Sequence, residues 1–274
     1  MIKSFRVNSG TIKVIDMSMH QIHDWIIPEW PAPSHVRACT TTRIGGFSSG
    51  VFTSMNLGDR TEDNIVSIAK NRNYLNSALQ LPAEPTWLFQ THGNRVVRLY
   101  DDTAANQEAD ASYTTIANKV CAVLTADCLP VLLCARDGSA VAAVHAGWRG
   151  LANSIVDNTI STLLHFAKCK PENLIAWLGP AIGSAVFEVG DDVREAFIKV
   201  LPHASMAFRP VTEGKWLADI YLLARQRLER MGVTEIFGGG YCTALQYEKF
   251  YSYRRDKETG RMATLIWIEG SEAA

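Results

Sequence analysis

Apolar residues are concentrated in the middle of the chain, in three short runs. The segments 120–128 (VCAVLTADC), 130–135 (PVLLCA) and 140–147 (AVAAVHAG) are apolar at most positions and rich in valine. Runs of this length with few polar positions are typical of strands that are buried on both faces. The pattern therefore predicts three buried strands that follow one another between residues 120 and 147.

A different spacing, with apolar residues three or four positions apart, predicts helices elsewhere. In the segment 61–80, Ile65, Ile68 and Leu75 recur at roughly helical spacing. The same reasoning predicts further helices at 151–168, 191–201 and 217–232. Further strands are predicted at 35–42, 86–90, 95–100, 173–179, 235–240 and 263–269. Because helices and strands are mixed without a strict βαβ rhythm, we expect a single mixed α/β domain with layers of helix and sheet.

Composition and charge are those of an ordinary globular protein. Of the 274 residues, 47% are hydrophobic and 20% are charged, with 27 Lys and Arg against 28 Asp and Glu. This balance creates no broad positive field, so we expect no general nucleic-acid binding. Local basic clusters can still bind a small anion.

Cysteine usage and the lack of long apolar runs predict a cytoplasmic protein. The six cysteines form no C-x-x-C pair, and the first residues are too polar for a secretory leader. No run approaches the roughly 20 apolar residues of a membrane span. Free thiols in a reducing cytoplasm are the simplest interpretation. Residues 1–24 precede a proline-rich segment and are predicted to be an appendage to a catalytic domain at 25–274.

The Asp-Gly dipeptide at 137–138 predicts a tight hairpin between the second and third apolar runs. If these two residues form the turn, the numbers of opposed residues add up to 275. Cys128 then faces Gly147, and His145 faces Pro130. Because strand side chains alternate between faces, Cys128 and His145 share a face, one diagonal step apart. Diagonal neighbours have Cβ atoms about 7–8 Å apart, so both side chains can reach one metal ion.

A thiolate and an imidazole on one face favour a metal site. Each residue alone has a plainer explanation, because free cysteine is often buried and a lone histidine usually fills a core or turn position. A third ligand would favour the metal site, and His92 is the best-placed candidate because it lies in a short turn between two predicted strands. The other histidines lie in the appendage, after prolines, on a helix or in a short connection: His20, His23, His35, His165 and His203.

A set of short motifs spread over the chain is highly specific in combination: TTRIGG, NLG, QTHGNRV, EADASYT, TADCLPVLL, VHAGWRG, WLGPAIG, FEVG, ADIYLLARQRL, FGGGYCT and FYSYRRDKETGRMA. Through these motifs the chain resembles the YfiH family of bacterial proteins from Trp25 onward. The resemblance implies a single-domain mixed α/β sandwich of the YfiH type. It also implies a metal centre of two histidines and one cysteine, which fall on His92, Cys128 and His145.

The family is named both for polyphenol oxidase (laccase-like) activity and for purine nucleoside phosphorylase activity. The resemblance thus implies phosphorolysis of adenosine, inosine and methylthioadenosine, and deamination of adenosine, with purine nucleosides and phosphate as partners. Three protein ligands leave a fourth position open, as in catalytic zinc sites. We therefore expect Zn²⁺, with Cu²⁺ as the alternative because copper also accepts nitrogen and sulfur donors.

Phosphorolysis requires a pocket for phosphate. Arg43 is the first candidate, because its guanidinium would lie beside the open backbone N–H groups of the 45–46 glycine pair. Further candidates for the phosphate are Arg149, Arg254 and Arg255. Each arginine can equally be part of a surface ion pair. Cys128, His145 and Arg43 form the predicted catalytic set, while Asp127 either hydrogen-bonds a metal ligand or caps a nearby loop.

Two other functions remain open. A multicopper oxidase needs a cluster of several more histidines, whereas the seven histidines are scattered and form no H-x-H pair. A Cys–His hydrolase, such as an amidase that edits a cell-wall precursor, would use Cys128 as nucleophile and His145 as base. Metal content separates the last alternative from the phosphorylase, because a thiolate bound to zinc is a poor free nucleophile.

Overall fold

The structure of the chain is a computed structural model that describes residues 15–16, 21–22, 24–100 and 106–270. Within the predicted appendage, it describes Asp24 and two paired strands, β1 (Ile15–Asp16) and β2 (Gln21–Ile22). The rest of the appendage lies outside the described residues, so its separation from a domain at 25–274 stays a prediction. Within the described ranges, no helix is both long and apolar enough to cross a membrane.

A six-stranded sheet forms the centre of the fold. Its order is β13 (Glu235–Gly238), β9 (Leu174–Leu178), β7 (Leu129–Ala135), β8 (Val141–Ala146), β5 (Ala111–Thr114) and β4 (Val96–Arg98). The two outer pairs are parallel and the inner pairs are antiparallel. Every residue of β7, β8 and β9 is buried, which explains why these segments are apolar at every position except His145.

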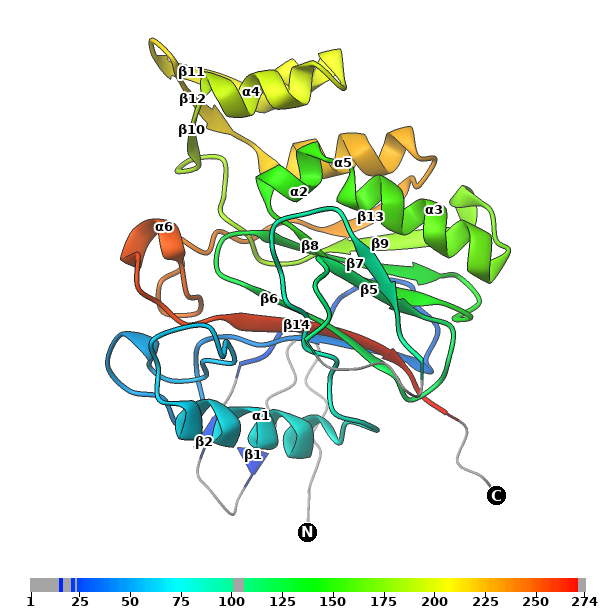
Figure 1. The fold of residues 1–274 in the computed structure, drawn as a ribbon, viewed down its shortest axis with the longest axis vertical. Coiled ribbons are helices and arrows are strands. Elements are labelled where there is room, and N and C mark those ends of the chain that lie inside the picture. Colours follow the sequence, from blue (N-terminus) through cyan, green and yellow to red (C-terminus); the bar gives the residue numbers. More distant parts are fainter. Residues whose placement is uncertain (1–14, 17–20, 23, 101–105, 271–274) are drawn as a thin grey trace.

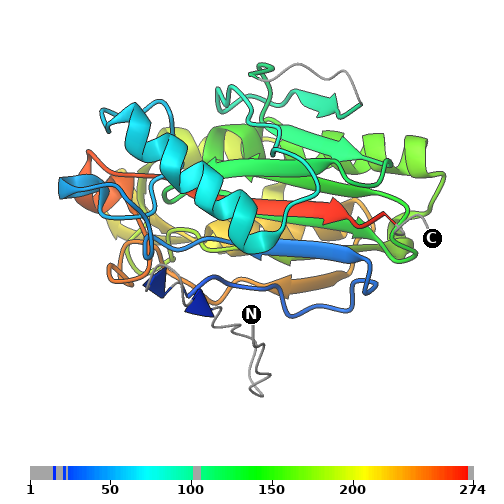
Figure 2. The same ribbon diagram turned by 90° about the horizontal axis from the view of Figure 1, so that it is seen from below.

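A second sheet packs against one face of the central sheet. It contains β3 (Val36–Thr40), β14 (Met262–Ile268) and β6 (Val120–Thr125), all antiparallel. An apolar cluster that includes Cys121, Leu132 and Ile266 fills the space between the two sheets. Helix α1 (Ile65–Leu79) covers the other face of the second sheet, as Figure 2 shows.

Helices cover the opposite face of the central sheet. These are α2 (Trp148–Ala152), α3 (Ile155–Ala167) and α5 (Ile220–Arg230), and they pack on one large apolar cluster. Local sequence sets where two helices begin, because Asn64 caps the first turn of α1 and Asp219 caps the first turn of α5. The layers are therefore helix, sheet, sheet and helix (Figure 1), a mixed α/β sandwich as expected.

A smaller unit lies beyond the helical layer. Strands β10 (Glu188–Gly190), β12 (Lys215–Ala218) and β11 (Phe208–Thr212) form a three-stranded sheet beside α4 (Asp191–Ile198). The remaining helical segments are α6 (Tyr253–Asp256) and three 3₁₀ turns, at Gly50–Phe52, Pro171–Asn173 and Pro202–Ala207.

Most elements expected from the sequence are confirmed, with two corrections. The segment 86–90 is not a strand, because Thr86 and Phe89 form isolated bridges to different neighbours and no continuous ladder develops. The helix expected at 151–168 is divided, because Ser154 adopts a left-handed backbone with φ of 70°. Short elements without a clear local pattern were not expected, namely β5, β10 to β12 and α6.

The expected hairpin register between β7 and β8 is confirmed. Pro130 pairs with His145, and the numbers of all paired residues add up to 275. The turn itself is longer than expected, because the innermost hydrogen bond joins Ala135 N–H to the Ala140 carbonyl. The loop therefore contains residues 136–139, with Gly138 at a positive φ of 73°. The loop is longer by one residue on each side, which leaves the register unchanged. The alternation of side chains therefore still places Cys128 and His145 on one face.

Candidate metal centre and surrounding cavity

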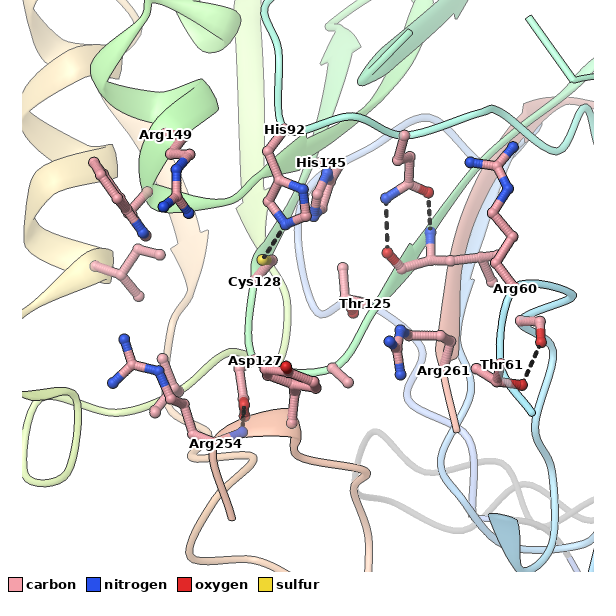
Figure 3. A pocket seen from close by; sticks show the side chains of 18 of the residues that line it. Arg60, Thr61, His92, Thr125, Asp127, Cys128, His145, Arg149, Arg254 and Arg261 are labelled. Carbon is pink, nitrogen blue, oxygen red and sulfur yellow. Dashed lines mark hydrogen bonds between the residues drawn. The ribbon is translucent and has the colours of Figure 1, made fainter. Parts of the chain in front are cut away.

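Three side chains from separate segments converge at one end of the central sheet (Figure 3). His92 lies in the turn before β4, Cys128 directly precedes β7, and His145 lies near the end of β8. Their ligand atoms all lie within 4.8 Å of one another, and Cys128 Sγ is 3.7 Å from His92 Nε2. The structure thus brings together the three residues expected from the sequence in a group that could hold a metal ion.

Asp110, next to the start of β5, positions two of these ligands. Its carboxylate accepts hydrogen bonds from the backbone N–H groups of Thr91, His92 and Gly93, at 3.2, 2.9 and 2.7 Å. These bonds stabilise a turn in which His92 has a left-handed backbone, φ 60°. Strained backbone of this kind persists only where the surroundings fix it, and it is common at functional sites.

The same carboxylate orients His145. Asp110 Oδ1 lies 2.8 Å from His145 Nδ1, and both side chains are almost completely buried. Burial would raise the pKa of Asp110, but the hydrogen bond and charge of His145 and the N–H groups of Gly93 and Thr91 lower it to about 2. With Nδ1 held by a carboxylate, Nε2 of His145 is left to bind a metal, the usual arrangement at histidine metal sites.

Asp110 was not singled out from the sequence. It lies in the EADASYT motif, and the signal that could have identified it is a carboxylate at the beginning of an otherwise uncharged, buried segment. Aspartate is almost never fully buried unless it has a partner. A buried strand was not expected at this position, however, so the unusual placement of the carboxylate was not visible.

The electrostatics of the group favour a thiolate at Cys128. Burial would raise its pKa, but the charge of His145 and hydrogen bonds with His145 and His92 lower it to about 6. For His145, burial would lower the pKa, but the charge of Cys128 and the hydrogen bond with Asp110 raise it to about 9. By contrast, burial raises the pKa of Cys121 and of Cys134 to about 12. Since the thiolate is the metal-binding form, Cys128 differs from both of these cysteines.

Gly147 completes the close approach of the three ligands. A Cβ atom at this position would lie 2.9 Å from His92 Cδ2 and 3.0 Å from Cys128 Sγ. The backbone of Gly147 has φ −62° and ψ 157°, which any residue can adopt. Glycine is therefore required here for space between the ligands and not for backbone freedom.

We expect Gly147→Ala to weaken metal binding while the protein stays folded. The added methyl group would push His92 and Cys128 away from their present positions, and we expect an approximately tenfold loss of Zn²⁺ affinity in a calorimetric titration. Gly240→Ala is the matched control, because a Cβ there meets no atom within 4 Å. Equal zinc affinity in both variants would contradict the ligand arrangement.

The metal-ligand group opens into a cavity of about 520 Å³. One side of the group carries apolar side chains together with two arginines, and the other side is more polar with two further arginines (Figure 3). The cationic residues of the lining are Arg149 and Arg254 on the first side, and Arg60 and Arg261 on the second. The cavity therefore combines a metal-ligand group with positive charge.

The structure does not bring Arg43 into this cavity. Its guanidinium donates to the backbone carbonyls of Thr53 and Tyr247 and lies over the ring of Tyr251. Arg43 is absent from the cavity lining, and its backbone holds the loop near Ser54. A role of Arg43 in phosphate binding stays a prediction that this arrangement does not support, because the guanidinium is engaged with its own loops.

The other residues considered from the sequence have distinct positions. Arg149 and Arg254 line the cavity, whereas Arg255 donates to the carbonyls of Thr243, Ala244 and Phe250 and holds the chain before α6. The carboxylate of Asp127 accepts hydrogen bonds from the Thr243 hydroxyl and the Arg254 N–H, both at 2.6 Å. Asp127 thus fastens nearby loops, one of its two expected roles.

Comparison with known proteins places the chain among well-defined relatives. The sequence profile of a family described as multi-copper polyphenol oxidoreductase laccase matches residues 37–269. Purine nucleoside phosphorylase YfiH of Escherichia coli is 53% identical over 244 residues, which are 89% of this chain and 98% of that protein. Purine nucleoside phosphorylase of Haemophilus influenzae is 48% identical over 246 residues, 89% of this chain and 99% of that protein.

Solved structures share the fold. A Neisseria meningitidis protein assigned to DUF152 has a TM-score of 0.85 at 46% identity, covering 90% of this chain and 99% of that chain. A Bacillus licheniformis protein named YfiH has a TM-score of 0.83 at 27% identity, covering 97% and 99% respectively. The fold class expected from the sequence is thus confirmed by both structures.

Proposed function

Because this chain belongs to the family described as multi-copper polyphenol oxidoreductase laccase, and its relatives are named purine nucleoside phosphorylase, we propose that it is a zinc-dependent purine nucleoside phosphorylase. Its proposed substrates are phosphate and adenosine, inosine or methylthioadenosine, with deamination of adenosine as a second activity. We place the reaction in the cytoplasm, an assignment supported by six free cysteines.

The observation that carries this proposal is the His92, Cys128 and His145 group at the wall of an arginine-lined cavity. Two imidazoles and one thiolate suit Zn²⁺, and three protein ligands leave a position for substrate or water. Zinc bound there would supply Lewis-acid chemistry. The cavity volume is within the range of about 300–1,000 Å³ that is usual for small-molecule sites, and its positive charge suits phosphate.

In phosphorolysis, a phosphate oxygen forms a bond to ribose C1′ while the bond from C1′ to the purine nitrogen breaks. The purine leaves with that electron pair and takes up one proton. The residues of the cavity must therefore hold phosphate and nucleoside side by side in a fixed orientation, which can supply a large part of the rate enhancement. Cationic groups that suit an anion and apolar side chains that suit a flat base are both present in the lining.

A copper-dependent polyphenol oxidase is the second candidate, and the family description favours it. The same His₂Cys ligands accept copper. Reduction of dioxygen to water requires four electrons, however, and a single ion with one thiolate cannot store them. In the part of the chain that the structure describes, His92, Cys128 and His145 form the single group of at least three potential ligands. A Cys–His hydrolase stays the third alternative, and metal content separates it from the other two.

We expect about one zinc per chain in protein purified without added metal, because the site has three ligands for one ion. The test compares zinc-loaded with copper-loaded protein, each assayed on adenosine with phosphate and on a phenol with oxygen uptake. The zinc form should release adenine only when phosphate is present, and the copper form should oxidise the phenol slowly. A zinc form that is inert on nucleosides, together with a copper form that oxidises phenols rapidly with matched oxygen uptake, would overturn the proposal.

A further inference from the structure

Arg261 is an anchored cation on the polar side of the cavity. The residue directly precedes β14, and its guanidinium points into the cavity in Figure 3. Nη1 donates to the carbonyls of Thr259 and Gly260 at 2.7 and 3.0 Å, and the Cγ packs over Gly58. Within the described residues, Nε and Nη2 have no hydrogen-bond partner. The side chain is thus held in place while two of its nitrogen atoms remain available to a ligand.

No carboxylate of the described residues lies within 4 Å of the Arg261 guanidinium. The two acidic residues in the lining are engaged elsewhere, since Asp59 forms an ion pair with Arg72 at 3.3 Å and Asp127 binds Thr243 and Arg254 N–H. A partly buried guanidinium that forms no close ion pair is costly. An anion bound in the cavity would remove that cost.

Thr125 supplies a second, independent observation in the same part of the cavity. Its side chain is 2% exposed and lines the cavity, yet within the described residues its hydroxyl has no hydrogen-bond partner. Gln90 does not provide one, and both ends of its amide instead bind the backbone of Leu124. Buried hydroxyl groups almost always have partners, so an unpartnered one on a residue that lines a cavity points to a ligand.

The sheet register places the backbones of Thr125 and Arg261 next to each other, and both side chains line the same cavity. Thr125 pairs with Met262 across β6 and β14, so Arg261 is the next residue beyond this pair. Cys128 follows Thr125 by three positions and lines the same cavity. The two available nitrogen atoms and the unpartnered hydroxyl therefore lie beside the metal-ligand group.

The opposite side of the cavity has a different character. Its lining there is largely apolar, with Trp148, Ile182, Phe187 and Ile220. Arg149 lies over the Trp148 ring, and Arg254 donates to the Glu188 carbonyl and lies near the Phe187 ring. Flat apolar groups pack well on such a surface. A nucleoside therefore suits this side, which leaves the polar side for phosphate.

We propose that Arg261 and Thr125 form the phosphate subsite of the reaction, next to the metal-ligand group and opposite the surface that receives the purine. This inference rests on the proposed phosphorylase function. Nε and Nη2 of Arg261 donate to two phosphate oxygens, and the Thr125 hydroxyl bonds to phosphate as well. The paired donors of a guanidinium match two oxygens of one phosphate group. Phosphate held there approaches ribose C1′ from the side opposite the purine.

The first test measures binding of inorganic phosphate to zinc-loaded protein by isothermal titration calorimetry. Thr125→Val removes the hydroxyl and keeps the shape, so we expect an approximately fivefold weaker phosphate affinity. Its melting temperature should not fall, because the hydroxyl has no partner to lose. Arg261→Gln should weaken phosphate binding by about ten- to a hundredfold, and Arg261→Lys should restore only part of it because an ammonium lacks the paired donors.

Arg149→Gln is the matched control, since it removes an arginine from the other side of the same cavity. We expect its phosphate affinity to stay within about twofold of the unmodified protein, since the change lies away from the subsite. Wild-type protein that binds no phosphate, or an Arg149 variant that loses phosphate while Thr125→Val retains it, would overturn the subsite. Retained phosphate affinity in folded Arg261→Gln would do the same.

Steady-state kinetics distinguish this inference from the proposed function. In phosphorolysis of adenosine, Arg261→Gln and Thr125→Val should raise KM for phosphate more than KM for adenosine. If the wild-type protein binds phosphate through these residues but never cleaves a nucleoside, the phosphorylase proposal fails and the anion subsite stands. If phosphate-dependent cleavage occurs and the variants keep the KM for phosphate, the subsite is wrong and the phosphorylase proposal stands.

Discussion

Cys128→Ala is expected to remove most of the zinc that co-purifies with the protein. Cys128 Sγ is the one sulfur within reach of both His92 and His145 in the described structure, and its low pKa supplies a thiolate at neutral pH. Loss of one of three ligands should weaken zinc binding by something on the order of a thousandfold, because the binding free energy is shared among the ligands. Elemental analysis and a competitive titration with a zinc chelator measure the loss.

Two further cysteines provide matched controls for this variant. Cys121 and Cys134 are both buried in the apolar cluster between the two sheets, and burial raises both of their pKa values. Cys134 is the sharper control because it lies on β7, the strand that Cys128 directly precedes. Cys121→Ala and Cys134→Ala should lower the free energy of unfolding through lost packing and retain zinc. Full zinc content in Cys128→Ala would exclude this residue as a ligand.

Asp110→Asn should impair the metal site without removing any ligand. Both carboxylate oxygens accept hydrogen bonds, from His145 or from the backbone of the His92 turn. The asparagine amide would replace one oxygen by an NH₂ group, which would then face one of these N–H donors. We expect zinc affinity to fall by about ten- to a hundredfold, the usual effect of losing such a supporting group. The free energy of unfolding should fall by about 2–4 kcal/mol, because a buried donor loses its acceptor.

Asp127→Asn is the control that separates the loss of zinc affinity in Asp110→Asn from its loss of stability. Asp127 is also buried and also accepts two hydrogen bonds, but its partners are Thr243 and the Arg254 N–H and not the metal ligands. We expect chemical denaturation to show a comparable loss of stability and calorimetry to show nearly unchanged zinc affinity. Equal losses of zinc affinity in the two variants would mean that Asp110 acts only through general stability.

The sequence alone determined those features of the fold and of the candidate site that are set by residues close together along the chain. The apolar runs identified β6, β7 and β8, because a strand buried on both faces has no polar side. The Asp-Gly turn fixed the register of β7 and β8, and side-chain alternation then placed Cys128 and His145 on one face. The position of His92 in a turn made it the best third ligand, and the motifs identified the family.

Tertiary structure decided everything that depends on partners far apart in the sequence. Asp110 became visible as the support of His92 and His145 only when β5 paired with β8, since no local pattern marks a four-residue strand. Arg43 has a glycine-rich neighbourhood that suggested phosphate, but contacts with Tyr247 and Tyr251 direct its guanidinium elsewhere. Tyr247 and Tyr251 lie about 200 residues after Arg43 in the sequence, so an argument based on local spacing cannot predict these contacts.

The proposed phosphate subsite also depends on residues that are far apart in the sequence. Arg261 and Thr125 come together because β14 pairs with β6, which joins the end of the chain to its middle. A hairpin sets its register through its own turn, whereas two strands so far apart obtain theirs from the packing of the whole sheet. The sequence therefore determined which residues form the candidate metal-ligand group, and the assembled sheets decided which other side chains line the same cavity.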